Sequence, residues 1–437
     1  MSIPSPDRSS LWDPCWNGRR KGLFIASIMS ALLLQLLILG NMSYLYGTSF
    51  HQSARSHALN ILVLDFDKSD IGAAMLQAST NLQGDYFPTI DTSATLSDPE
   101  AVRQSVCNAD YWAAMFVNQG ASEHLHRTLD GTSDEDYDPT SAITYIYNQA
   151  RYPIVADSVL INSISSIVQA SRDAYYESAD GTAALASLNA SNPVARAAYL
   201  NPIGSTAHLI QPTRQVSRAF HNTVNFVIPP LAQFFFILAL NGIGLQMGFL
   251  AGATVKDVWL FRFIAGKVYA LVSGLVMAGY IWSFKEGSVL GSSAFFKSWM
   301  LFWFLMDVHW QVMETVIASY VPIQYTPFFV FTWIIANVAS TVFPYELTPG
   351  WYRIGYALPS REAYVIMIQI WSGCASELHI ALPVLFTWWL VGHITAAFSV
   401  RKRCFDAATI AAEYDAGELT AASSMTRVTQ EEDKTVT

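Results

Sequence analysis

The sequence predicts a membrane-spanning α-helical bundle of about six transmembrane helices, with an extracytoplasmic α/β domain inserted between helices 1 and 2. Three observations predict this fold class. The 437-residue chain is 52% hydrophobic and only 14% charged, whereas soluble domains carry roughly 25% charged residues. Residues 22–47 contain no charged side chain, and a helix needs about 20 apolar residues to cross a bilayer. Further apolar runs follow in the C-terminal half, beyond a stretch of mixed, water-soluble composition.

The first apolar run predicts an uncleaved anchor helix at residues 22–47, behind a cytoplasmic N-terminal tail of residues 1–21. A cleaved signal peptide has a shorter apolar region and a small-residue cleavage site. Arg19, Arg20 and Lys21 end the tail, and cations flank spans on the cytoplasmic side. We therefore expect the N-terminus in the cytoplasm and the chain after residue 47 outside it.

Residues 48–222 are expected to form the extracytoplasmic domain. Residues 59–66 and 113–117 have the apolar runs of buried strands, and residues 122–129 and 158–176 have helical patterns. Strands that alternate with helices favour an α/β fold, although the pattern does not give the strand order. Two Asn-x-Ser sequons predict glycosylation, at Asn189 within this domain and at Asn41, which lies close to the bilayer.

The C-terminal half predicts a five-helix bundle over residues 223–400, followed by a cytoplasmic tail, residues 401–437. The expected spans lie within residues 223–255, 263–284, 298–320, 322–343 and 378–400. With the anchor they make six, and an even count returns the C-terminus to the cytoplasm. Arg401, Lys402 and Arg403 directly follow the last run, in agreement with this orientation. The same topology places Lys256 and Arg262 in a cytoplasmic loop.

Residues 344–377 separate the last two spans; they are too polar to cross the membrane and too aromatic for an ordinary loop. We expect this segment to lie at the outer surface or to re-enter the membrane from it, with its aromatic side chains at the headgroup level. Its charged side chains would stay in water or find partners inside the bundle. The candidate functional residues of the segment are Glu346, Tyr352, Arg353, Arg361 and Glu362.

A polar stripe in the expected fourth span is the main candidate for a site within the membrane. Asp307, Gln311 and Glu314 share one face of a helix, whereas His309 points elsewhere. A central charge costs about 2.5 to 3.5 kcal/mol to insert, so the stripe should face the bundle interior, where it could bind a cationic group or pass protons. The alternative is that these carboxyl groups are protonated or pair with neighbouring helices and only fix the packing. Asn337, in the next span, is a further pathway candidate, with an interhelical hydrogen bond as the alternative.

No pattern in the sequence indicates catalysis. The chain lacks a phosphate-binding P-loop, a G-x-S-x-G elbow, an H-E-x-x-H motif and a Gly-rich dinucleotide turn. We therefore expect no enzyme activity, no cofactor and no metal site. The net charge of -9 argues against nucleic-acid binding. Cys107 and Cys374 face the oxidising side in this topology and either form a disulfide or remain two free thiols.

Residues 336–392 resemble the fungal nitrosoguanidine-resistance membrane protein family. The shared motifs are an Asn in a span (Asn337), Pro-x-Glu-Leu-x-Pro (residues 344–349), Tyr-x-x-Gly-Tyr-Ala-Leu-Pro (352–359) and Ala-Leu-Pro-Val-Leu-Phe-x-Trp-Trp (381–389). That family is similar in layout to the permease half of ABC exporters and to bacterial phage-infection proteins, and it lacks an ATPase. The resemblance implies a plasma-membrane role in resistance to toxic compounds or in lipid arrangement, and it supplies no catalytic residues.

Two hypotheses of different class follow. In the first, the chain is a transporter, or a transport accessory, that moves small amphiphilic molecules or membrane lipids. Its energy would come from a separate ATPase bound near residues 256–262 or from a proton gradient acting on Asp307 and Glu314, and it could work as a homo-oligomer. In the second, the chain is a scaffold or receptor that transports nothing, and its outer domain binds a protein or cell-wall partner.

Overall fold

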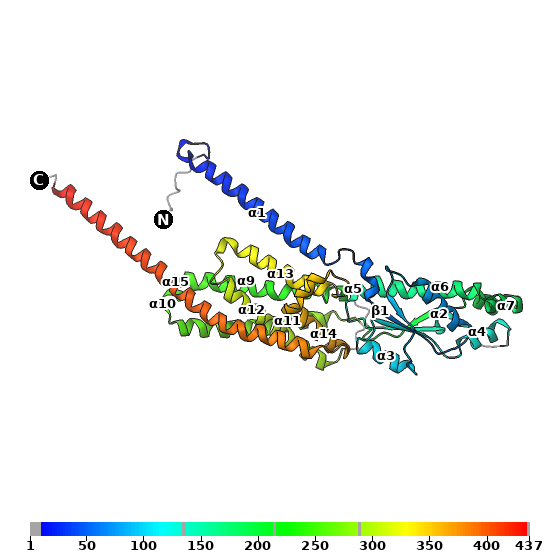
Figure 1. Ribbon diagram of the computed structural model, residues 1–437. Helices are drawn as coiled ribbons and strands as arrows, with labels where there is room; N and C mark the ends of the chain where they lie inside the picture. The colour runs from blue at the N-terminus through cyan, green and yellow to red at the C-terminus, as the bar shows by residue number, and fades with distance from the viewer. Residues whose placement is uncertain (1–9, 133–136, 213–215, 287–289, 435–437) are drawn as a thin grey trace.

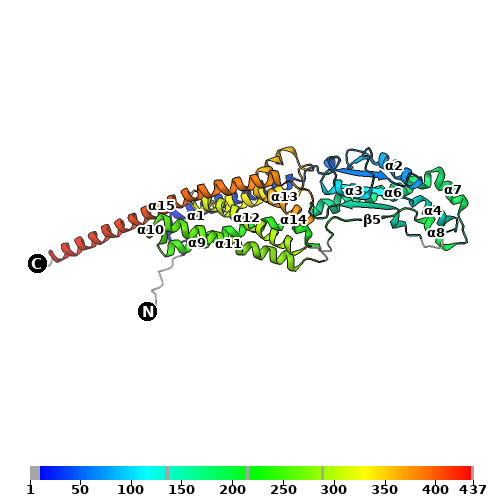
Figure 2. The same cartoon turned by 90° about the horizontal axis from the view of Figure 1, so that it is seen from below.

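The computed structural model describes residues 10–132, 137–212, 216–286 and 290–434. The molecule is elongated: a helical bundle forms one end and a sheet covered by helices forms the other (Figure 1). The long helices α1 (Arg19–Gly47) and α15 (Leu378–Lys434) have their outer ends on the side away from the sheet (Figures 1 and 2). The described part of the chain thus has the expected order of anchor, inserted domain and bundle.

The inserted domain is built on a five-stranded sheet with the order β2-β1-β3-β4-β5. All neighbouring strands are parallel except β3 and β4. The two strands that the sequence predicts are β1 and β3, which pair with each other in the middle of the sheet. The strand bounds are β1 Asn60–Asp65, β2 Thr89–Asp91, β3 Ala113–Val117, β4 Ile143–Tyr147 and β5 Ser205–Ala207.

Helices cover both faces of this sheet because alternate residues of each strand point to opposite sides. Ile61 and Val63 pack into one core with α2 and α6, whereas Leu62 and Leu64 pack into a second core with α3. Helix α6 and the turns before it, residues 153–177, are long and apolar enough to cross a membrane, yet Ile164 belongs to the first of these cores. The helices of the domain are α2 Asp70–Leu82, α3 Pro99–Cys107, α4 Ala121–Leu129, α5 Pro153–Val155, α6 Ile161–Glu177, α7 Ala179–Ser187 and α8 Pro193–Leu200.

The bundle surrounds a central helix, α12, of which every residue from 305 to 314 is buried. Small residues let α11 approach it closely: an added Cβ on Gly274 would lie 2.8 Å from the backbone nitrogen of Trp303. Outside the inserted domain, length and apolar composition mark four described helices as candidate spans, namely α1, α9, α11 and α15. The bundle helices are α9 Val224–Gln246, α10 Phe249–Gly252, α11 Val255–Ser283, α12 Ser292–Val316, α13 Thr326–Val342 and α14 Pro359–Ser372, together with α1 and α15.

One expectation about the bundle needs correction. Arg262 was expected in a cytoplasmic loop, but it lies inside α11 and is 3% exposed, because its guanidinium group is paired within the bundle. The hydropathy pattern does not show where a charged side chain finds its partners. The expected tail begins within α15, which continues as a helix to Lys434.

A disulfide and hydrogen bonds join the inserted domain to the bundle. Cys107, at the end of α3, is bonded to Cys374, after α14, so of the two alternatives for these cysteines the structure has the bridge. The main-chain N–H of Ala375 donates to the carbonyl of Cys107 at 2.7 Å. The Tyr364 hydroxyl of α14 accepts from the N–H of Tyr152 at 2.8 Å. The outer end of α14 is therefore fixed to the sheet domain.

The turn before α9 completes this junction. The ring of His221 lies edge-on to Trp371 of α14, with ring centroids 4.6 Å apart. Burial, and secondarily the nearby Arg218, lower the pKa of His221 to about 4. The ring is therefore neutral at neutral pH and packs as an apolar group. The short 3₁₀-helices of the described chain are η1 Pro14–Trp16, η2 Ser53–Ala58, η3 Pro139–Ser141, η5 Val216–Phe220, η6 Ile323–Tyr325 and η7 Gly350–Ala357, and η4 Ala156–Leu160 is a short π-helix.

Candidate functional site

The structure places the polar stripe of α12 in the bundle interior. Asp307, Gln311 and Glu314 are 2%, 3% and 2% exposed, and their helix lies between α9, α11, α14 and α15. The three residues do not form one site. Asp307 and Gln311 belong to one polar cluster, and Glu314 belongs to another about one helical turn away.

The Glu314 cluster is a pair of arginines on one carboxylate. Arg262 of α11 donates from Nε and Nη2 to the two oxygens of Glu314, both at 2.6 Å. Arg403 of α15 donates to the same carboxylate at 2.7 Å and to Oδ1 of Asn241, on α9, at 3.0 Å. All three charged side chains are at most 9% exposed. Bidentate arginine–carboxylate pairs are strong and have a fixed geometry, so this cluster ties four helices together.

The Asp307 cluster is built around a lysine. Lys267 of α11 donates to Oδ2 of Asp307 and, at 2.7 Å, to Nε2 of His393 on α15. The indole N–H of Trp389 donates to the same Asp307 oxygen at 2.8 Å, and the amide of Gln311 donates to Oδ1 at 3.3 Å. Lys267 keeps 20% of its side chain exposed. This cluster is therefore open at one side, unlike the Glu314 cluster.

A small cavity separates the two clusters. Its lining includes Gln311 and His393 on the side of the first, and Arg262 and Glu314 on the side of the second. Its volume of about 10 Å³ is the space that one water molecule needs. A single water could thus connect the two clusters.

Asn337 and His309 have structural partners. The Asn337 side chain donates to the carbonyl of Trp333 at 2.9 Å and accepts from the backbone N–H of Ser360 at 3.2 Å, at the start of α14. His309 accepts from the indole of Trp333 at Nδ1, at 3.1 Å. These contacts match the alternative reading of Asn337 as an interhelical hydrogen-bonding residue. Neither side chain touches the Asp307 cluster in the described structure.

The segment 344–377 re-enters the bundle. Helix α14 begins at the level of Asn337 and ends beside Asn148 of the sheet domain, whose amide donates to the Ser372 hydroxyl at 3.1 Å. The buried Arg361 pairs with Glu362 at 3.0 Å and with Glu377 at 2.8 Å. The Tyr352 hydroxyl donates to the carbonyl of Tyr44, on α1, at 2.6 Å. Arg353 and Glu346 are exposed.

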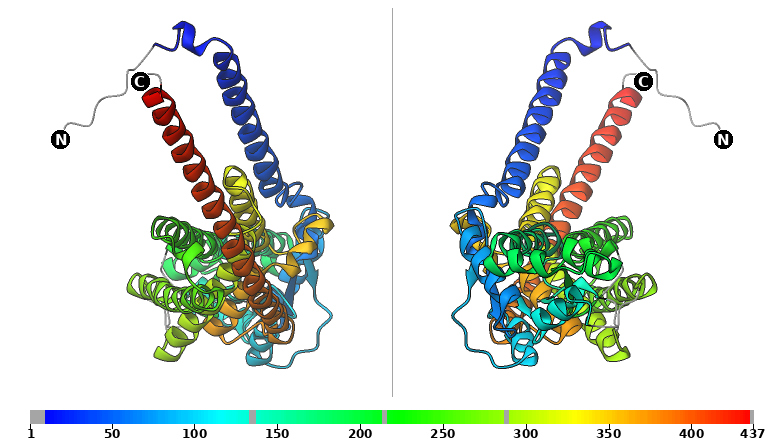
Figure 3. Two further views of the ribbon diagram at one scale, coloured as in Figure 1. Left: turned by 90° about the vertical axis from the view of Figure 1, so that its left-hand side faces the viewer. Right: turned by 90° about the vertical axis from the view of Figure 1, so that its right-hand side faces the viewer.

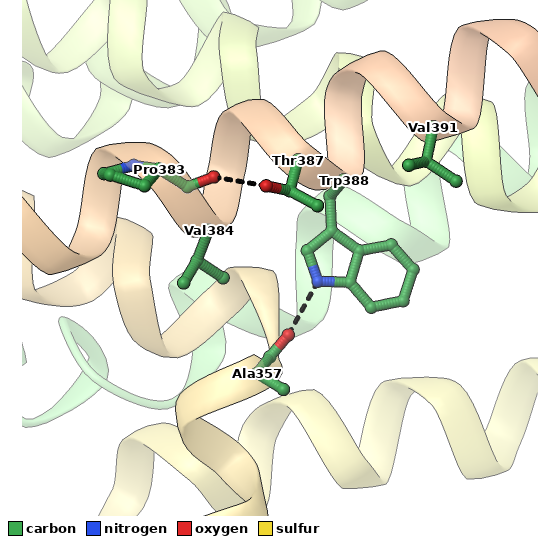
Figure 4. A pocket seen from close by; sticks show the side chains of 6 residues that line it. All are labelled: Ala357, Pro383, Val384, Thr387, Trp388 and Val391. Carbon is green, nitrogen blue, oxygen red and sulfur yellow. Dashed lines mark hydrogen bonds between the residues drawn. The ribbon is translucent and has the colours of Figure 1, made fainter.

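An apolar groove opens beside this segment, between α1, α13, η7 and α15. One part, of about 540 Å³, is lined by residues that include Gly40, Asn41, Ala336, Trp351 and Ile354. A second part, of about 460 Å³, is lined by Ala357, Pro383, Val384, Thr387, Trp388 and Val391 (Figure 4). Ala357 and Trp388 border both parts, and the Trp388 indole donates to the Ala357 carbonyl at 2.6 Å (Figure 4).

The groove exists because α1 contacts the bundle only near its C-terminal end and leans away elsewhere (Figure 3). At that contact the amide of Asn41 donates to the Thr332 hydroxyl at 3.2 Å. Asn41 is thus buried in a helix contact, and its amide nitrogen is already engaged there; its glycosylation stays a prediction. Asn189 is exposed in the loop between α7 and α8, and its glycosylation stays a prediction.

Several residues of these sites were missed in the sequence. Lys267 lies within an expected span, where a lone lysine in an apolar run is itself a signal of an intramembrane partner. His393 lies in the last expected span, where a histidine is more often a packing residue, and Arg403 follows that span as a cytoplasmic marker. No sequence signal reveals the groove, because its walls come from four separate segments.

Comparison with known proteins gives a family without an assigned activity. A family model with the description "Protein of unknown function (DUF3533)" matches residues 30–394. An uncharacterized endoplasmic reticulum membrane protein of Saccharomyces cerevisiae, YJR015W, is 20% identical over 399 residues, which cover 81% of this chain and 75% of that protein. No solved structure matches the chain.

Proposed function

The chain belongs to the DUF3533 family of membrane proteins, and from this premise we propose that it binds lipid-like amphiphiles in the groove beside Trp388 and moves them within or across its membrane. Resistance to toxic amphiphilic compounds would follow from such an activity. The observation that carries the proposal is the groove itself. Its two parts, of about 540 and 460 Å³, each fall within the roughly 300–1,000 Å³ usual for small-molecule sites.

The short helix η7 supports a phospholipid as the occupant. In a 3₁₀-helix, residues three apart lie above one another, so Trp351, Ile354 and Ala357 form one apolar row, and all three line the groove. Arg353 lies on another, exposed face of the same short helix. A guanidinium group suits a phosphate, while the apolar row suits an acyl chain.

The proposal includes an orientation. A Cys107–Cys374 bridge needs an oxidising compartment, which supports a sheet domain outside the cytoplasm and both termini inside it. The yeast relative is named as an endoplasmic reticulum protein, and the resemblance to the resistance family favours the plasma membrane. Both membranes give the sheet domain the same oxidising side, and we propose the plasma membrane.

Photo-crosslinking tests the groove. Full-length protein in native membranes is exposed to a phospholipid with a photoactivatable acyl chain, and the labelled residues are identified by mass spectrometry. We expect labels on α1, η7 and α15 around Trp388. Gly40→Leu should weaken the labels in the part of the groove that Gly40 lines by narrowing it, whereas Gly22→Leu is the matched control, since an added Cβ meets nothing within 4 Å at either glycine of α1.

Movement of lipid is measured separately, by fluorescent phospholipid accessibility in proteoliposomes. Crosslinking in the groove without movement would indicate that a partner such as an ATPase is missing. Equal labelling of wild type and Gly40→Leu would overturn the groove as the binding site. Absence of both labelling and movement would favour the scaffold or receptor hypothesis.

A further inference from the structure

We propose that Lys267, Asp307 and His393 form a proton-operated switch. In this switch, protonation of His393 moves the ion pair of Asp307 from Lys267 to His393. The inference deepens the proposed function, since it assigns the energy source of lipid movement to a proton. The groups involved come from three helices: α11, α12 and α15. Moving the Asp307 bond from Lys267 to His393 therefore releases α11 from Asp307, while α15, already joined to this carboxylate by Trp389, gains a second contact.

The hydrogen bonds define the starting state. Nδ1 of His393 lies 2.7 Å from the carbonyl oxygen of Trp389; because a carbonyl can only accept, Nδ1 carries the hydrogen. Nε2 then carries a free lone pair, and it accepts a hydrogen bond from the ammonium group of Lys267 at 2.7 Å. The proposed starting state combines a charged Lys267, a neutral His393 and an ionised Asp307. The cluster has no net charge.

Adding one proton at Nε2 of His393 removes one of the two acceptors of Lys267. Two cations would then face each other at 2.7 Å, which is unfavourable in a low-dielectric interior. Oδ2 of Asp307 is already 3.9 Å from Nε2 of His393. The imidazolium can therefore donate a hydrogen bond to this oxygen after a small movement. Lys267, partly exposed, moves away toward the open side. The cluster gains one positive charge, and no covalent bond other than N–H forms or breaks.

The surroundings favour His393 over Glu314 as the proton site. The charged groups around the clusters are Arg262 and Lys267 from α11, Asp307 and Glu314 from α12, and His393 and Arg403 from α15. Helix α9 contributes the neutral Asn241. Two arginines on one carboxylate leave a surplus positive charge at Glu314, and a proton entering the one-water cavity would be repelled there.

The test measures the distance between α11 and α15 as a function of pH. Spin labels are placed at V268C and I394C, two exposed positions next to Lys267 and His393, in full-length protein with Cys15→Ser and Cys404→Ser. We expect a distance change of about 1–2 Å, the size of helix shifts in switching proteins, between neutral and acidic pH. His393→Asn should abolish the change, while His379→Asn, an exposed histidine of the same helix, should keep it.

His393→Gln serves as a second variant if His393→Asn does not fold, as judged by size-exclusion chromatography. A pH-dependent change that survives in either folded variant, or no change in the wild type, would overturn the switch. Lipid movement is followed in parallel with and without a proton gradient. Lipid movement that does not depend on the gradient, together with normal groove labelling, would overturn the switch and leave the proposed function intact. A pH-dependent distance change without groove labelling would support the switch and overturn the groove as the binding site.

Discussion

Arg262 and Lys267, five residues apart on α11, hold their carboxylates in different ways. Arg262 spans both oxygens of Glu314, and a guanidinium group does not lose its proton in proteins. Lys267 reaches a single oxygen of Asp307 and also donates to His393. The arginine pair has one stable hydrogen-bonding geometry, whereas the lysine can exchange between two acceptors. The sequence assigns one role to the two acidic residues, but their partners differ. Glu314 has a fixed contact, and Asp307 has a contact that can change.

Removing one arginine at a time should show that Arg262 stabilises the fold. Arg262→Met leaves Glu314 with one partner and breaks a bidentate buried pair, a type of change that costs about 3–5 kcal/mol. Arg403→Met leaves the bidentate pair intact, and we expect a smaller loss of about 1.5–3 kcal/mol, the contribution of a hydrogen bond to a charged group. Thermal unfolding of detergent-solubilised protein, followed by size-exclusion chromatography, measures both. Equal losses would contradict the assigned difference.

At the residue scale, the helical spacing of Asp307, Gln311 and Glu314 correctly placed them on one buried face. The spacing could not identify Lys267 or His393 as partners, because a periodicity within one helix carries no information about the rotation of its neighbours. A search for charged residues within the other apolar runs would have found Lys267, since an intramembrane charge needs a counter-charge.

At the scale of elements, glycine spacing on α11 decides how close the helix lies to α12. Gly266, Ala270, Gly274 and Ala278 recur every four residues and are all buried, and such stripes let membrane helices approach closely. The close approach is what brings Arg262 and Lys267 within reach of the α12 carboxylates. Helix packing and the polar clusters therefore depend on each other.

Gly274→Ala should destabilise the bundle, whereas Gly279→Ala on the same helix should not. An added Cβ at Gly274 would lie 2.8 Å from the backbone nitrogen of Trp303, which cannot rotate away, and the Cβ at Gly279 meets nothing within 4 Å. Overpacking of this kind costs about 1–3 kcal/mol, and replacing glycine in a helix gains about 1 kcal/mol when nothing clashes. Thermal unfolding of the two variants gives the comparison, and equal melting temperatures would show that α11 can shift without cost.

The sequence predicts helices better than it predicts what they do. The expected span at residues 298–320 corresponds to α12, Ser292–Val316, and the expected strands are both present. Helix α6 has the apolar composition of a span but packs in the sheet domain. Hydropathy reports how apolar a segment is, and it does not distinguish lipid from a protein core as the surroundings.

At the scale of the whole molecule, the junction between sheet domain and bundle sets how a signal could pass between them. Helix α14 touches the bundle at its start, where Ser360 contacts Asn337, and the sheet domain at its end, where Ser372 contacts Asn148. The disulfide bond joins Cys107 and Cys374, which are 267 residues apart in the sequence, just beyond the end of this helix. Movement of α14 in the bundle is therefore coupled to the sheet domain.

Replacing both bridge cysteines by serine should separate the unfolding of the two parts. In the chain-entropy view a disulfide across a long loop stabilises by constraining the unfolded chain, so we expect a loss of about 2–5 kcal/mol. Only non-covalent contacts, such as the hydrogen bonds of Tyr364, Ser372 and Ala375, would then hold the junction, and calorimetry should change from one transition to two. Cys15→Ser is the control, because Cys15 is outside the bridge. A single, unshifted transition in the double variant would mean that α14 packing, rather than the covalent link, couples the sheet domain to the bundle.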